Sequence, residues 1–207
     1  MKKLILIVLV CALGIPSMAQ EFRVGATAGV NVNIPSGEYS GQTGINVGVK
    51  AELGLPHVTK GWLVDFGALL SSHGWNSRGY YDNTTGTLLK WEATPYYLNI
   101  PVHMGYKFNC SDNFKFFAAV GPYLNIGLFG KEMMTATVLN QSTTTTASNN
   151  VFSDKAQERF VWGVGLRLGA ELYENWQLSV GYDWDMRAAS NTGMHNRTLC
   201  ISCAYLF

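Results

Sequence analysis

The chain has 207 residues, a length that suits one domain, and 14% of them are charged, 13% are aromatic and 22 are glycine. Its formal net charge is +1. A nucleic-acid partner normally requires a basic stripe, so this composition argues against one, and no nucleic acid is expected.

The first residues have the three parts of a secretory signal peptide. Lys2-Lys3 form a basic start, residues 4–10 are continuously apolar, and Ser17-Met18-Ala19 place small residues before a cleavage site. The apolar run is shorter than the roughly 20 residues that cross a bilayer as a helix. A lipoprotein cleavage at Cys11 is disfavoured by the bulky residue before it. We therefore predict a signal peptide over 1–19.

The mature chain, predicted to be one domain over 20–207, is organised with a period of two residues. In the segment 176–187, Trp, Leu, Val, Tyr, Trp and Met alternate strictly with Gln, Ser, Gly, Asp, Asp and Arg. Such alternation indicates strands with one apolar face and one polar face. Seven further segments have the same pattern, and the full set covers 23–33, 45–55, 62–71, 96–108, 114–128, 160–172, 176–187 and 198–207.

The connections alternate in length. The short ones hold Pro, Gly, Asn and Asp, which suit tight turns; they cover 56–61, 109–113 and 174–175. The long ones cover 35–43, 72–90, 131–156 and 188–197, and the third includes a polar low-complexity stretch, 141–150, that cannot build a core. This alternation is typical of outer-membrane barrels, with periplasmic turns at one rim and external loops at the other.

A soluble lipocalin-like barrel would also alternate, so the sizes of the side chains decide between the two. The polar face is rich in small residues, which suit a narrow interior, whereas the apolar face carries many Trp, Tyr and Phe residues. An eight-stranded barrel has too little interior space for so many rings. We therefore expect the apolar face to contact lipid. Tyr205 and Phe207 lie on it and resemble the terminal sorting signal of outer-membrane barrels.

The polar face then lines the barrel interior, and its charges nearly balance. The predicted interior cations are Arg23, Lys50, Lys107, Lys115, Arg167 and Arg187, and the anions are Glu52, Asp65, Glu171, Asp183 and Asp185. Buried charges are costly unless they are paired. A packed interior network is favoured over an ion or proton path, because an eight-stranded barrel is only wide enough for its own side chains.

The residues that commonly perform chemistry are scattered. Histidines occur at His57, His73, His103 and His195, and the mature cysteines are Cys110, Cys200 and Cys203. None of them has metal-ligand spacing, and no nucleophile motif or phosphate-binding loop is present in the sequence. We predict no catalytic, cofactor-binding or metal-binding residue, no cofactor, and no enzyme activity.

One segment resembles a known family. Residues 96–108, with Tyr-Leu-Asn-Ile-Pro inside them and Tyr-Lys-Phe at their end, resemble the fourth strand of the PorT-like outer-membrane beta-barrel domain family. Residues 119–123 and 24–31 resemble two other strands of that family. The resemblance implies an eight-stranded antiparallel up-and-down transmembrane barrel of the OmpA/OmpX-like architecture. A mid-strand proline lacks a ladder donor, so Pro101 and Pro122 are each predicted to mark a bulge or bend.

Function is less determined than fold. The favoured hypothesis is a structural or interaction role through the external loops, with outer-membrane lipid around the barrel and a protein or envelope partner at the loops. The family resemblance suggests a second hypothesis, a component of a secretion or transport system. An outer-membrane enzyme is a third hypothesis without positive support. A monomer is expected.

Overall fold

Every regular element of the described chain is a β-strand. The computed structural model describes residues 22–55, 61–138, 143–153, 157–190 and 193–207. The predicted signal peptide lies outside these ranges, as do residues 56–60 of the first predicted turn. The strands are β1 (Phe22–Pro35), β2 (Tyr39–Gly41), β3 (Thr43–Gly54), β4 (Trp62–Ser72), β5 (Trp75–Ser77), β6 (Tyr80–Asp82), β7 (Thr87–Ser111), β8 (Phe114–Val138), β9 (Thr143–Asn150), β10 (Phe160–Leu172), β11 (Trp176–Asp185) and β12 (Asn196–Leu206).

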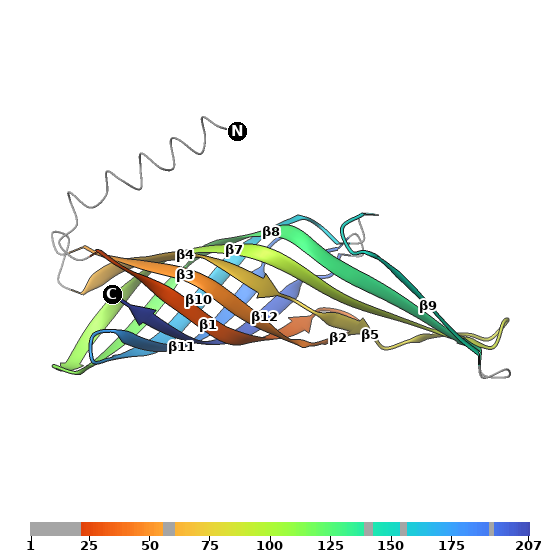
Figure 1. Ribbon diagram of the computed structural model, residues 1–207, viewed down its shortest axis with the longest axis horizontal. Coiled ribbons are helices and arrows are strands. Elements are labelled where there is room, and N and C mark those ends of the chain that lie inside the picture. Colours follow the sequence, from red (N-terminus) through yellow and green to blue (C-terminus); the bar gives the residue numbers. More distant parts are fainter. Residues whose placement is uncertain (1–21, 56–60, 139–142, 154–156, 191–192) are drawn as a thin grey trace, which may run out of the picture.

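Eight of these strands close into a barrel (Figure 1). They are β1, β3, β4, β7, β8, β10, β11 and β12, and each pairs antiparallel with the next one along the chain. β12 pairs antiparallel with β1, with Val30 opposite Ile201, and so completes the ring. A closed ring leaves no unpaired edge in its wall. The predicted eight-stranded antiparallel up-and-down barrel is confirmed.

The two faces of the wall differ as the alternation predicts. In β11, Trp176, Leu178 and Val180 are about half exposed on the outer face, whereas Gln177 and Asp183 are buried inside. Among the residues that the structure describes, no helix is long and apolar enough to cross a membrane.

Aromatic rings gather at both ends of the outer face. Trp62 packs edge-on against Tyr106, and Trp176 packs against Tyr205 at the same end. Further ring pairs, Tyr182 with Trp184 and Tyr96 with Phe129, lie toward the opposite end. Two aromatic bands that flank an apolar belt are the girdles of a barrel in a bilayer.

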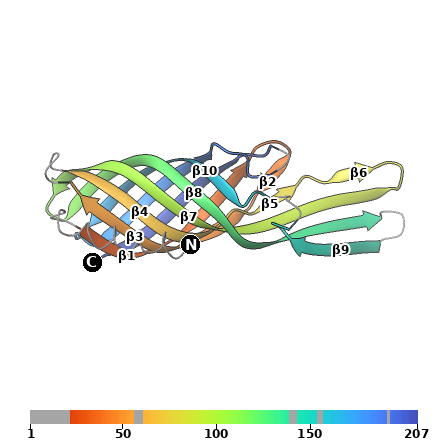
Figure 2. The same ribbon diagram turned by 90° about the horizontal axis from the view of Figure 1, so that it is seen from above.

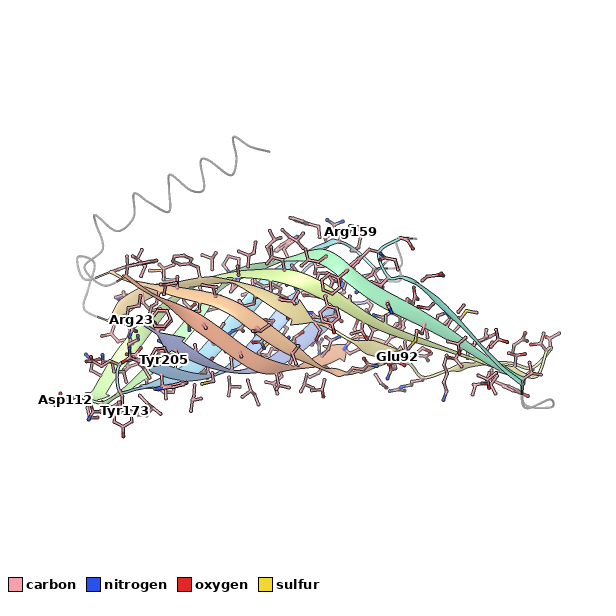
Figure 3. The ribbon with its side chains drawn as sticks, viewed as in Figure 1. Arg23, Glu92, Asp112, Arg159, Tyr173 and Tyr205 are labelled. Carbon is pink, nitrogen blue, oxygen red and sulfur yellow. The ribbon has the colours of Figure 1, made fainter. Side chains whose placement is uncertain are left out.

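The two ends of the barrel have different connections. At one end, here called the tight-turn end, β7 and β8 are joined by two residues, and Tyr173 and Glu174 turn the chain with positive φ angles of 50° and 65°. Asp112 and Tyr173 mark this end in Figure 3. The short connections predicted at 109–113 and 174–175 are therefore confirmed.

The opposite end, here called the extension end, differs from the prediction. β7 and β8 have 25 residues each, whereas the other six ring strands have 10 to 14. They continue past the ring as a paired ladder, with β6 added to β7 and β9 added to β8 (Figure 2). We call this sheet of β6, β9 and the outer parts of β7 and β8 the extension.

The long connection predicted over 131–156 contains regular strand structure for much of its length, which the sequence pattern did not indicate. Residues 131–138 continue β8, and Thr143–Asn150 form β9, with Ala147 opposite Met134. Thr is a strong strand former, and a hairpin strand needs a partner rather than a core. The described side chains of 144–150 are exposed, so the expectation that this stretch builds no core holds.

The register of the strands shows no bulge at Pro101 or Pro122, and a bend at these prolines stays a prediction. Between β7 and β8 the register shifts at Tyr96/Tyr97, where Leu128 is the extra residue, and it is unchanged across Pro101. Pro122 sits in regular register opposite Val164. A proline removes one donor without adding a residue, so the ladder can lose a hydrogen bond and keep its register.

Candidate functional site

The interior of the barrel at the tight-turn end is filled by a network of ion pairs. Glu171 accepts from Arg23 at 2.5 Å and from Lys107 at 2.7 Å, and its side chain is fully buried. Glu52 receives the same two cations, with the Lys107 Nζ–Glu52 Oε1 distance at 2.6 Å. Gln177 donates to both carboxylates at 2.8 and 2.9 Å. Arg23 lies near this end of the barrel in Figure 3.

A second set of pairs lies farther along the lumen. Lys50 pairs with Asp65 at 2.8 Å, and Arg167 forms a two-pronged pair with Asp183 at 2.5 and 2.9 Å. Buried carboxylates and cations stabilise a fold only when each finds a partner, as these do. Lys115, 3.5 Å from Glu171, and the buried Asp185 complete the set, so ten of the eleven charges predicted to lie inside belong to the lumen.

The exception is Arg187. β11 ends at Asp185, and Arg187 is exposed and pairs with Glu158 at 3.1 Å, so its prediction as an interior cation is wrong. The strand alternation does not continue past the end of the strand. Asp185 does face inward, where Tyr123 donates to it at 2.6 Å.

The sequence interpretation missed three large rings inside the barrel. Tyr97, Phe117 and Tyr123 are at most 3% exposed. Each occupies an inward position of its strand, so the alternation alone could have placed them. Glycines directly opposite two of them on the neighbouring strand β10 leave room for the rings: a Cβ on Gly163 would lie 2.5 Å from the Tyr123 hydroxyl, and one on Gly169 would collide with Phe117.

The lumen between these groups has little free space. A cavity of about 60 Å³ lies among Lys50, Asp65, His103, Arg167 and Asp183. Such a volume holds at most a few water molecules. The interior network predicted from the charge balance is therefore a packed filling of the barrel.

An apolar cluster closes the lumen at the extension end. We call it the cap; its buried members are Trp75, Ala93, Tyr97, Val151, Phe152, Val161, Ala189 and Met194. Phe152, which follows β9, packs edge-on against Tyr97 with the ring centroids 5.6 Å apart. Trp75 donates to Gln157 at 3.3 Å and anchors the connection between β4 and β7. The long connections thus fold back over the barrel mouth.

The extension beyond the cap offers exposed backbone as well as exposed side chains. In the described sheet, β9 has one neighbouring strand, β8, so its other edge is unpaired. Its residues include no charge and no proline, the features that usually protect an edge strand.

At the tip of β6, the Thr84 backbone N–H and the Thr85 hydroxyl donate to Asp82 and hold the pKa of its carboxyl below its ordinary value.

A pocket of about 540 Å³ lies where the extension meets the cap, and we call it the rim pocket. Its lining residues are Glu38, Tyr39, Trp75, Ser77, Arg78, Gly79, Tyr80, Trp91, Glu132, Ser190 and Met194. Nearby, Gln42 donates to Asn76 at 2.6 Å and to Glu92 at 2.7 Å, which ties the connection between β1 and β3 to β5 and β7. Glu92 is labelled in Figure 3. No sequence pattern predicted this pocket.

Of the described histidines and cysteines, His103 and Cys200 both line the small lumen cavity, and the others lie apart from it. His103 is buried in the lumen, and His73 is buried and bonded to the Ser71 hydroxyl at 2.9 Å. His195 contacts the Asp185 carbonyl, while His57 lies outside the described residues. Within the described ranges, no group of three or more His, Cys, Asp and Glu residues could hold a metal ion. The absence of catalytic and metal sites stays a prediction.

Comparison with known sequences identifies one family. The family model described as "Outer membrane protein beta-barrel domain" matches residues 18–187, which is most of the chain. This match supports outer-membrane location and the barrel fold, and it does not single out the PorT-like branch. No curated protein matches the chain.

Two solved outer-membrane proteins illustrate the structural likeness. Ail, the attachment invasion locus protein of Yersinia pestis, solved in complex with the heparin analogue sucrose octasulfate, is 12% identical with a TM-score of 0.41; the alignment covers 91% of this chain and 100% of that one. Neisserial surface protein A is 13% identical with a TM-score of 0.42, over 90% and 97%. Likenesses this distant carry no argument about partners.

Proposed function

The chain belongs to the outer membrane protein beta-barrel domain family, and from this premise we propose that the barrel anchors an interaction surface that stands outside the cell. That surface is the extension with the rim around it. In this proposal residues 1–19 direct export and are removed after Ala19. The tight-turn end, where both β1 begins and β12 ends, faces the periplasm.

The observation that carries the proposal is the length of β7 and β8. The ring is already closed by strands of 10 to 14 residues, so the outer parts of the two 25-residue strands do nothing for the barrel wall. Ordering a segment costs conformational entropy, about 1–2 kcal/mol for each backbone residue. Since the wall gains nothing from the extension, we take its order to serve contact with another molecule. A regular, four-stranded structure with exposed side chains on β9 is suited to contact with another molecule.

The unpaired edge of β9 offers one mode of contact. An extended segment of a partner can add to such an edge through main-chain hydrogen bonds. The exposed Met133 and Met134 on the neighbouring strand, 39% and 38% exposed, add adaptable apolar contacts beside it. The secretion-component alternative draws no specific support from the described residues.

Photo-crosslinking on intact cells tests the proposal. A photoreactive residue at Met133 should yield a discrete product, whereas one at the lipid-facing Val180 should not. The product should disappear when residues 135–146 are replaced by Asn-Gly, because this change joins the paired Met134 and Ala147 through a two-residue hairpin turn and removes the outer half of β9 together with residues 135–138 of β8. A product that persists in this variant, or that forms only at Asp112 of the tight-turn end, contradicts the proposal.

A further inference from the structure

We infer that the rim pocket binds a neutral oligosaccharide, an inference that rests on the proposed external role of this end of the barrel. Its volume of about 540 Å³ lies within the range of roughly 300–1,000 Å³ that small-molecule sites occupy. The pocket lies on the cap, which contributes Trp75 and Met194 to its lining. A ligand here would therefore not enter the lumen.

The pocket is assembled from segments far apart in the sequence. Tyr39 comes from β2, Tyr80 from β6, Trp91 from β7, and Met194 from the connection between β11 and β12. Every long connection of the barrel except that following β8 contributes, and β8 itself contributes Glu132. The pocket therefore exists only when these segments are packed together in the folded protein.

The base of the pocket is held rigidly. Trp75 is 6% exposed, its indole N–H donates to Gln157, and the ring of Tyr39 packs edge-on against it at 5.0 Å. Ser77 accepts from the Trp91 backbone N–H at 2.9 Å. A site whose side chains are already fixed loses less conformational entropy when a ligand binds.

The aromatic lining suits the faces of sugar rings. Four of the lining residues are Trp or Tyr, from the deep Trp75 to Tyr80, which is 61% exposed at the rim. A pyranose presents C–H groups on its faces and hydroxyl groups around its edge. The negative face of an aromatic ring attracts the weakly positive C–H groups, and its area covers them from water.

The charged lining residues favour a neutral ligand. Glu38 would oppose an anion, and Arg78 would oppose a cation. A purely apolar ligand would remove these groups from water without replacing their hydrogen bonds, which is costly. Sugar hydroxyls can accept from a guanidinium and donate to carboxylates, so one neutral polyhydroxyl ligand can satisfy charges of both signs.

The test uses the full barrel in lipid nanodiscs and follows intrinsic tryptophan fluorescence. The neutral probes are maltotriose, mannotriose and galactotriose, and the charged comparators are trigalacturonic acid and a glucosamine trimer. We expect saturable binding of at least one neutral probe, with affinities for both comparators at least about fivefold weaker. Isothermal titration calorimetry then gives the affinity of each variant independently of the fluorophores.

Two neighbouring tyrosines provide a matched pair of variants. Tyr80 lines the pocket, whereas Tyr81, also exposed on β6, does not. Tyr80→Ala and Trp91→Ala should each weaken binding at least about fivefold, whereas Tyr81→Ala should leave it within about twofold. Because Tyr80 and Tyr81 are both on the surface, neither change should prevent folding.

Three results would overturn the inference: no saturable binding of any neutral probe to the folded wild type, tighter binding of a charged comparator, or equal effects of Tyr80→Ala and Tyr81→Ala. The crosslink at Met133 is measured separately and does not depend on sugar binding. The sugar-binding inference can therefore fail while the proposed external role still holds. Conversely, loss of the crosslink with intact sugar binding would count against the edge of β9 alone.

Discussion

Glu171 is the carboxylate around which the ion network of the lumen is organised. Arg23, Lys107 and Lys115 all lie within 3.5 Å of its oxygens, and the side chain is fully buried. When one partner of a buried pair is removed, the remaining charge stays desolvated and uncompensated. Removing the Glu171 charge should therefore destabilise the barrel chiefly because its partner cations would stay buried without a counter-charge.

Glu171→Gln should lower the unfolding free energy of the barrel by about 3–5 kcal/mol. Denaturant titration in detergent, followed by the shift of the folded barrel on unboiled gels, measures the change. Glu158→Gln is the control, because its pair with Arg187 is exposed and worth about 0–1 kcal/mol. Equal effects of the two substitutions would contradict the assignment of a buried network.

Gly127 leaves room for the ring of Phe152 in the cap. A Cβ at this position would lie 2.5 and 2.6 Å from two ring carbons of Phe152, so Gly127→Ala should displace that ring at a cost of about 1–3 kcal/mol. Hydrogen exchange at 150–153 should rise. In the background of Phe152→Ala the same change should have little further effect; an undiminished effect there would show that the ring is not the cause.

The alternation of side chains predicted single residues well where the strand is part of the ring. It even assigns the missed Tyr97 and Phe117 to the interior once every position is counted. It failed at Arg187, because alternation has meaning only while the backbone is extended and paired. The residue at which β11 ends is set by its pairing with β10 and β12, and the sequence of β11 alone does not indicate it.

Among the elements, β6 and β9 were the least predictable. Both lie outside the ring, where neither face is buried, so no hydrophobic pattern marks them. The Thr-rich stretch reads equally well as a loop. It becomes a strand through pairing with β8, which the composition of the stretch alone does not indicate.

The extension should be separable from the barrel. Residues 135–146 belong to the outer end of β8 and to β9, which lie in the extension and not in the ring. Replacing them by Asn-Gly should therefore leave the unfolding free energy of the barrel unchanged within about 0.5 kcal/mol. Circular dichroism and gel-shift unfolding of the full and shortened chains provide the comparison. A clearly less stable shortened barrel would mean that the extension serves the wall rather than an external partner.

At the scale of the whole molecule, the lumen is filled at one end by ion pairs and closed at the other by the cap. Purified protein in planar bilayers should therefore show no stable single-channel current. Eight-stranded barrels hold side chains rather than an open channel. Stepwise, long-lived conductance would contradict the packed interior, and conductance that appears only in the Glu171→Gln variant would support it.

The rim pocket could not have been anticipated from the sequence, because its residues have no common pattern. Trp75 lies in the predicted connection 72–90, Trp91 lies between that connection and the predicted strand 96–108, and neither is near Tyr39 in the sequence. The alternation of side chains predicts the fold, whereas the pocket forms where long connections that are distant in the sequence pack together over the barrel mouth.

The orientation of the barrel underlies the whole account, and selective cysteine labelling tests it most directly. Cys110 is exposed at the tight-turn end, and Ser148→Cys places a thiol on exposed β9. On intact cells a membrane-impermeant maleimide should modify position 148 and leave Cys110 unmodified until the outer membrane is permeabilised, as read by peptide mass spectrometry. Labelling of Cys110 but not of position 148 on intact cells would contradict the external role of the extension.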